Sequence, residues 1–134
     1  MKHHGFHLIE VLVVCAILGI LLSIAIPGYT TYIRDAKRVE AKIMLLKYAF
    51  ALERYSFLQN SYQGATAELL HLPSETRDKQ YQIVMNALSD YQYELRAAPQ
   101  SAQFKRDVEC RTLTLNQAGE RGITGKGTVE KCWR

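Results

Sequence analysis

The chain begins with an almost uninterrupted apolar run. Between residues 6 and 33 the only Asp, Glu, Lys or Arg is Glu10, and Val11 to Ile26 contains no charge and no proline. As a helix, residues 6 to 26 would be roughly 31 Å long, which matches the hydrocarbon core of a bilayer. We expect a retained transmembrane helix. A cleaved secretory signal has a shorter apolar run and small residues at its end, unlike Pro27-Gly28-Tyr29.

Two residues distinguish this run from a plain membrane anchor. An ionised side chain such as Glu10 costs about 2.5–3.5 kcal/mol at the bilayer centre. It is tolerated near the interface, beside the positive end of the helix dipole, or with a cationic partner. Pro27 removes a backbone donor. We expect it to kink the helix without ending it, because a helical pattern follows.

Residues 34 to 60 have apolar positions at spacings of three and four, which predicts an amphipathic helix. We expect this apolar stripe to pack on a sheet. Joined to the first run, it makes one helix of about 55 residues, roughly 80 Å long. The stripe consists of Ala36, Val39, Ile43, Leu46, Phe50 and Phe57.

After residue 80 the apolar positions alternate with a period of two. The segment 81–85 is apolar and β-prone, residues 91–97 alternate strictly, and Leu113 and Leu115 alternate with threonines. Turns are expected at 86–90 and 116–119, a helical turn at 65–70, and a fourth strand near 128–131. Short loops favour an antiparallel meander, so the predicted class is α+β.

Composition limits the function further. The chain has 134 residues, 48 % apolar and 22 % charged, with net charge +4 and a pI near 9.0. These values indicate one small globular domain behind the apolar run. No nucleotide loop, serine elbow, HExxH motif or catalytic carboxylate pair is present. We therefore expect no enzyme activity and no cofactor.

The three cysteines differ in their surroundings. Cys15 lies in the apolar run, whereas Cys110 and Cys132 flank a glycine-rich tail in the part expected outside the membrane. Two cysteines in an oxidising compartment predict a disulfide. Closing a loop of about 20 residues would contribute roughly 3 kcal/mol. The histidines, at positions 3, 4, 7 and 71, are distant in sequence from this pair, so no metal site is assigned.

The first residues resemble a known processing signal. Residues 5 to 10 are Gly-Phe-His-Leu-Ile-Glu, after a short leader and before the apolar run. This resembles the N-terminus of type IV prepilins, with His7 where threonine is commonest. Shorter similarities follow at 25–27, 53–55 and 60–62, and the layout of Cys110, Cys132 and Trp133 is similar too. This layout is similar to that of the PilE-like subfamily, which includes ComP-like DNA-binding minor pilins.

The resemblance implies a processing and assembly pathway. A prepilin peptidase would cleave between Gly5 and Phe6 and methylate the Phe6 amine. Glu10 would then pair with that amine on a neighbouring subunit, and Pro27 would belong to the same assembly helix. The implied division is leader 1–5, transmembrane and assembly helix 6–33, and pilin head 34–134. The head would lie in the periplasm, above the inner membrane and the assembly platform, and later on the surface fibre. The two C-terminal cysteines would bound the usual disulfide loop.

The resemblance leaves three functions open. The first is a structural subunit of a type IV pilus, major or more simply minor, in a fibre for adhesion, motility or DNA uptake. The second is a pseudopilin of a type II secretion system, and the third is a minor pilin that captures DNA. The tail lacks the acidic calcium loop typical of major pseudopilins. From residue 105 to 134 it carries seven basic and four acidic residues, an excess that could neutralise DNA phosphates. The candidate DNA-binding residues are Lys105, Arg106, Arg111 and Lys126.

Overall fold

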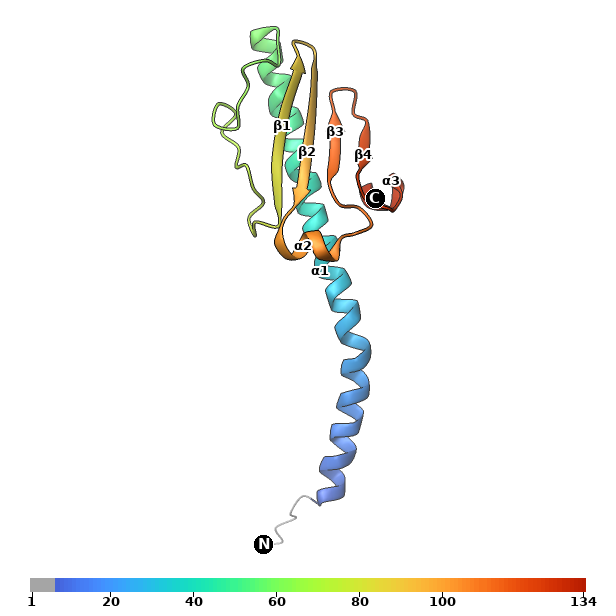
Figure 1. Ribbon diagram of the computed structural model, residues 1–134. Helices are drawn as coiled ribbons and strands as arrows, with labels where there is room; N and C mark the ends of the chain where they lie inside the picture. The colour runs from blue at the N-terminus through green and yellow to red at the C-terminus, as the bar shows by residue number, and fades with distance from the viewer. Residues whose placement is uncertain (1–6) are drawn as a thin grey trace. The chain divides into compact units, whose positions relative to one another are not determined.

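The longest element of the protein is helix α1, Leu8–Gln59. The computed structural model describes residues 7 to 134 (Figure 1). The 52 residues of α1 include Pro27, whose carbonyl oxygen accepts hydrogen bonds from the Thr30 and Thr31 hydroxyls. The prediction that the helix continues past Pro27 is confirmed, and the expected kink stays a prediction. By its internal contacts the chain forms two units, one ending at Ile33 and the other beginning at Arg34.

In the first unit, no other described part of the chain packs against α1. From Leu8 to Tyr32, every large apolar side chain is at least 50 % exposed. This segment is long and apolar enough to cross a membrane. Glu10 lies in its first turn and Cys15 is exposed on it. Such a surface needs lipid or other apolar helices around it.

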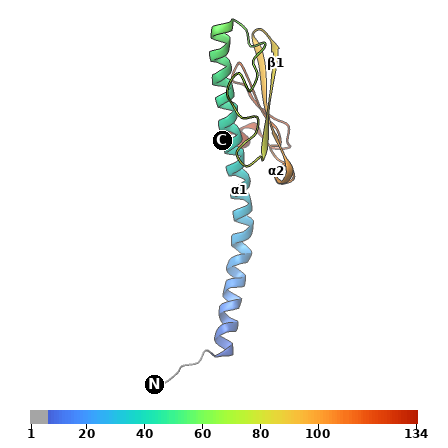
Figure 2. The same ribbon diagram turned by 90° about the vertical axis from the view of Figure 1, so that its left-hand side faces the viewer.

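In the second unit, α1 packs on the sheet with a different face from the one predicted. The predicted stripe is solvent-exposed, with Ile43 49 % and Phe50 75 % accessible. The neighbouring face is the buried one, and Figure 2 shows this part of α1 along one face of the sheet. The stripe prediction is therefore wrong. The buried residues of α1 are Arg38, Ala41, Met44, Leu45, Tyr48 and Leu52.

The sheet has four antiparallel strands in the order β1-β2-β3-β4. They are β1, Tyr81–Ser89; β2, Gln92–Pro99; β3, Leu113–Asn116; and β4, Arg121–Ile123. In β2 the alternate residues Tyr93, Leu95 and Ala97 are buried, as their period of two predicts. The α+β class and the meander are confirmed (Figure 1).

Several predicted boundaries are wrong. Strand β1 continues to Ser89, so the first hairpin turn contains only residues 90 and 91. By contrast, the helical turn predicted at 65–70 is present: residues 67–71 form a hydrogen-bonded turn, in which the Leu70 amide donates to the Thr66 carbonyl at 3.0 Å. The fourth strand lies at 121–123, and Val129–Trp133 is a helix, α3. A second short helix, α2, Ser101–Arg106, was not predicted.

The core of the second unit is self-contained. All of its buried apolar residues lie between Ala41 and Trp133. They come from α1, the sheet and the cysteine pair, with Tyr62 from the loop after α1 and Trp133 from α3. The second unit also contains the disulfide between Cys110 and Cys132. A fragment 34–134 therefore retains the complete core.

Candidate nucleic-acid interface

Two segments that are distant in sequence run side by side next to the sheet. The amide of Thr124 donates to the Thr112 carbonyl at 3.0 Å, that of Gly125 to Cys110 at 3.2 Å, and that of Gly127 to Glu109 at 2.7 Å. A Cβ on Gly125 would lie 2.0 Å from the Glu109 carbonyl oxygen, so this approach requires glycine. Residues 108–112 and 124–127 thus form one surface.

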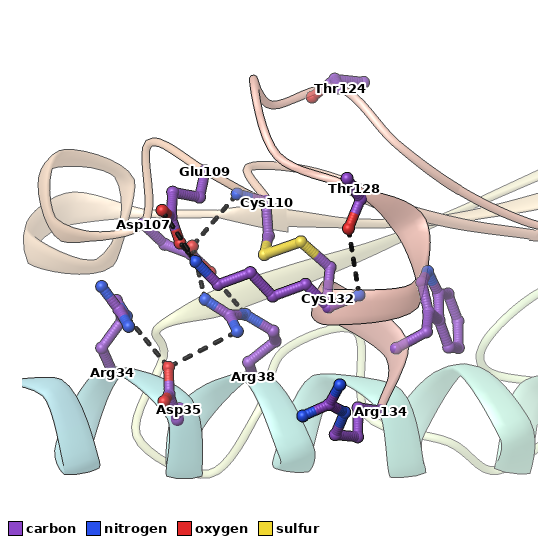
Figure 3. Close-up of a disulfide and its surroundings, with 12 residues drawn as sticks. Arg34, Asp35, Arg38, Asp107, Glu109, Cys110, Thr124, Thr128, Cys132 and Arg134 are labelled. Carbon is purple, nitrogen blue, oxygen red and sulfur yellow. Dashed lines mark hydrogen bonds and ion pairs between the residues drawn. A yellow bond between two sulfur atoms is a disulfide. The ribbon is translucent and has the colours of Figure 1, made fainter.

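The disulfide fastens helix α3 to this surface. Cys110 and Cys132 are both fully buried, and Figure 3 shows their bond between the loop after α2 and α3. Thr128 caps α3 by accepting from the Lys131 amide, and the Trp133 indole donates to the Gly122 carbonyl at 3.0 Å. The predicted disulfide is confirmed.

Asp107 links the same loop to α1 and β1. Its fully buried carboxylate accepts hydrogen bonds from Arg38 on α1, from the Tyr81 hydroxyl at 3.0 Å and from the Cys110 amide at 3.2 Å. Burial alone would lower the pKa of Arg38. The hydrogen bond and the charge of Asp107 outweigh it, so the pKa of Arg38 lies above its usual value and the guanidinium stays charged.

Three of the four candidate cations lie within four residues of Asp107 in the sequence. Lys105 and Arg106 end α2 directly before Asp107, and the Arg111 amide donates to the Asp107 carbonyl at 2.9 Å. Lys126 lies on the paired segment, where its amide approaches the Val108 carbonyl at 3.4 Å. The fold thus places the candidate residues on adjacent backbone segments. Their role in DNA binding stays a prediction.

The acidic residues of the loop are compensated. Asp107 is buried against Arg38, and Glu109 forms an ion pair of 2.8 Å with Lys131 on α3. The hydrogen bond from Lys131 lowers the pKa of the Glu109 carboxyl. By contrast, the four candidate cations form no ion pair within residues 7 to 134.

Sequence reasoning missed two contributors to this site. Arg38 was not singled out in the sequence, because no helical periodicity marks a buried arginine. Phe104 was not assigned to any element, yet it lies under Arg111, with the guanidinium carbon 4.1 Å from the ring centroid. The only sequence signal was an aromatic residue within a basic run.

The remaining candidate residues belong to the N-terminal segment. The proposed cleavage site between Gly5 and Phe6 lies outside the described residues. Glu10 lies in the first turn of α1, and its amide donates to the His7 carbonyl at 3.0 Å. Within residues 7 to 134 no group of three or more His, Cys, Asp or Glu is arranged to hold a metal ion.

Solved structures with related folds are type IV pilins. A type IV pilin from Shewanella oneidensis superposes with a TM-score of 0.52 at 22 % identity, covering 66 % of this chain and 89 % of that one. The Neisseria meningitidis non-core minor pilin PilV gives 0.56 at 21 % identity, covering 70 % and 89 %. These similarities establish the fold.

Sequence comparison identifies the family. The type IV major pilin protein PilA of Myxococcus xanthus is 30 % identical over 82 residues, which is 61 % of this chain and 37 % of that protein. The model of the prokaryotic N-terminal methylation motif matches residues 1–26. A family model described as type IV minor pilin ComP, DNA uptake sequence receptor, matches residues 27–114. The chain therefore belongs to the ComP family of type IV minor pilins.

Proposed function

We propose that this chain is a minor subunit of a type IV pilus whose head binds duplex DNA. The observation that carries the proposal is the cluster of Lys105, Arg106, Arg111 and Lys126, here called the basic surface. Arg111 and Lys126 lie on the two hydrogen-bonded segments, and Lys105 and Arg106 end the helix directly before the first of them. The nearby carboxylates of Asp107 and Glu109 are paired with other cations. Uncompensated cations on a rigid surface attract phosphates and release counterions. The family description, a DNA uptake sequence receptor, supports the same ligand.

The test is a gel-shift titration of fragment 34–134 with a duplex of about 30 base pairs, at about 50 and 200 mM salt. Binding should weaken with salt, and replacing the basic surface with glutamine should make the log–log slope shallower by about 0.9 per lost phosphate contact. The matched control replaces four exposed cations on α1 and the loop before β1, namely Lys47, Arg54, Arg77 and Lys79. No retardation, or equal loss in both variants, would refute DNA binding here.

We also propose assembly into a fibre through α1. Two exposed apolar surfaces support this. One is α1 from Leu8 to Tyr32, and the other is the stripe of Val39, Ile43, Leu46 and Phe50 on the head. Other pilin subunits are the natural cover for both, because lipid would reach only the first. The type II secretion pseudopilin is the less supported alternative, since the family match is to a pilin.

The processing and assembly residues can be tested separately. A prepilin peptidase would cleave between Gly5 and Phe6, and a bulky residue at Gly5 should leave unprocessed precursor. Glu10→Gln should be cleaved normally but enter sheared fibres poorly, because the Phe6 amine of its neighbour loses a charged partner. Normal incorporation of Glu10→Gln would exclude the pairing. Before assembly the chain would lie in the inner membrane with its head in the periplasm.

A further inference from the structure

We propose that Arg111 is the residue of the basic surface that reads base identity, by donating two hydrogen bonds to O6 and N7 of a guanine in the major groove. This inference rests on the proposed DNA binding and assigns different roles within it. Lys105, Arg106 and Lys126 would contact phosphates and position the duplex.

The backbone of Arg111 is held in place on every side. Its amide donates to the Asp107 carbonyl at 2.9 Å, and the preceding residue, Cys110, is fully buried in the disulfide. The following amide, of Thr112, donates to the Thr124 hydroxyl at 3.1 Å. Arg111 itself has φ 53°, a left-handed conformation that few residues adopt without support. A side chain that discriminates between nucleobases must project from a backbone held in one position, as that of Arg111 is.

The side chain of Arg111 is stacked and its donors are unused. The guanidinium carbon lies 4.1 Å from the centroid of the Phe104 ring, and no hydrogen bond or ion pair occupies the guanidinium within residues 7 to 134. Stacking on a ring restricts the plane of the guanidinium and leaves the N–H groups at its edge free. Phe104 remains 47 % exposed, so a ligand can reach the stack.

The side chains of the other three cations are not held in one orientation by such contacts. Lys105, Arg106 and Lys126 are exposed, and none has a side-chain hydrogen bond or aromatic partner in the described chain. Exposed cations without a fixed orientation suit phosphates, which accept hydrogen bonds from many directions. A planar fork with a fixed orientation suits guanine, whose O6 and N7 acceptors form the commonest specific contact with arginine.

The experiment uses oxidised fragment 34–134 and duplexes with about 20 randomised base pairs. Sequences enriched by the wild-type fragment are compared with scrambled duplexes of the same composition. The specificity ratio is the Kd for scrambled duplex divided by the Kd for the selected one. Arg111→Lys keeps the charge and the backbone but loses the fork. It should lower the ratio by roughly 5- to 150-fold, the worth of one bidentate base contact, because affinity for the selected duplex falls far more than affinity for the scrambled one.

Two further variants and a modified base sharpen the result. Lys126→Gln should weaken both duplexes equally and keep the ratio. Phe104→Leu keeps apolar bulk but removes the aromatic face, so it should lower the ratio less than Arg111→Lys does. Replacing the selected guanines with 7-deazaguanine removes N7 without changing base pairing. When the guanines are replaced one at a time, 7-deazaguanine at one position should weaken binding of the wild-type fragment. The same replacement should leave binding of the Arg111→Lys fragment unaffected. Thermal unfolding confirms that each variant is folded.

The outcomes separate the two proposals. If Arg111→Lys and Lys126→Gln both keep the ratio, Arg111 is a phosphate contact and the inference is wrong. If no sequence is enriched although duplexes bind, the inference is wrong and the proposed function stands. If no duplex is retarded at low salt, both are wrong.

Discussion

The guanidinium of Arg38 donates two hydrogen bonds to the carboxylate of Asp107, from Nη2 to Oδ1 at 2.7 Å and from Nε to Oδ2 at 3.0 Å. The residues are 69 positions apart, and Arg38 is only 6 % exposed. The pair joins α1 to the loop that carries the basic surface. It also holds a negative charge below that surface without exposing it to a ligand.

Removing one partner of this pair should be costly. Arg38→Met leaves the Asp107 carboxylate buried without its cation, and we expect the free energy of unfolding to fall by about 3–5 kcal/mol. The double variant Arg38→Met/Asp107→Leu removes both charges, so it should lose much less than the sum of the single variants. Urea unfolding of fragment 34–134 measures each value.

A solvent-exposed pair provides the control. Arg96 bonds Glu94 at 2.7 Å, but its side chain is 51 % exposed. Arg96→Met should cost between zero and about 1 kcal/mol. Additive losses in the Arg38 and Asp107 variants would mean that the two charges are not coupled.

The matched leucines at 45 and 46 test which face of α1 carries the fold. Leu45 is fully buried, and Leu46 is 51 % exposed. Leu45→Ala should destabilise fragment 34–134 by about 2–5 kcal/mol, because it leaves a cavity against the sheet. Leu46→Ala should change stability by less than about 0.5 kcal/mol. Both changes have the same effect on helix propensity, so a comparable loss at the two positions would contradict the assigned packing.

These leucines also explain why the helix was predicted correctly and its buried face was not. Two apolar stripes run along α1 at helical spacing, one through Ile43 and Leu46 and one through Ala41 and Leu45. Periodicity establishes the helix, but only the sheet decides which stripe is covered. The buried stripe begins with Arg38, whose charge made that face look polar. Its partner, Asp107, is too far along the chain for any local pattern to reveal.

The strands and short helices show a similar limit. Strand β2 was predictable because its alternation reflects one buried face, seen at Tyr93 and Leu95. Helix α3 has only five residues and is held by the Thr128 cap and the Cys132 disulfide, so its β-branched Val129 misled the prediction. The basic surface was proposed from a charge excess. The pairing of the nearby acidic residues with Arg38 and Lys131 depends on tertiary contacts, as does the stack of Arg111 on Phe104.

The disulfide should stabilise the second unit substantially. Cys110 and Cys132 are 22 residues apart, and a loop of that size contributes roughly 3 kcal/mol when closed. The double variant Cys110→Ser/Cys132→Ser should lose about that much in urea unfolding, and binding to duplex DNA should weaken as α3 loosens. Thiol labelling of the denatured, unreduced full chain should find one reactive cysteine, Cys15. Labelling of three thiols would show that the bond does not form.

Alkaline pH should weaken the fold through its buried tyrosines. Burial raises the pKa of the Tyr81 hydroxyl, which donates to Asp107 at 3.0 Å, and burial also raises the pKa of Tyr48 and Tyr93. In the unfolded chain these groups ionise near pH 10. Above about pH 10 the unfolded state therefore holds fewer protons than the folded state, and stability falls as pH rises. Below that value the same groups are protonated in both states and contribute no slope.

Tyr81→Phe isolates the contribution of one hydroxyl. At pH 8 the variant should be less stable by about 1.5–3 kcal/mol, because a hydrogen bond to a buried carboxylate is lost. Phenylalanine does not titrate, so the variant lacks that part of the alkaline loss. The difference in unfolding free energy from the wild type should narrow as pH rises above about 10. Urea unfolding of both fragments between about pH 8 and 11 measures this. A constant difference across that range would mean that Tyr81 titrates alike in both states, and would contradict its burial against Asp107.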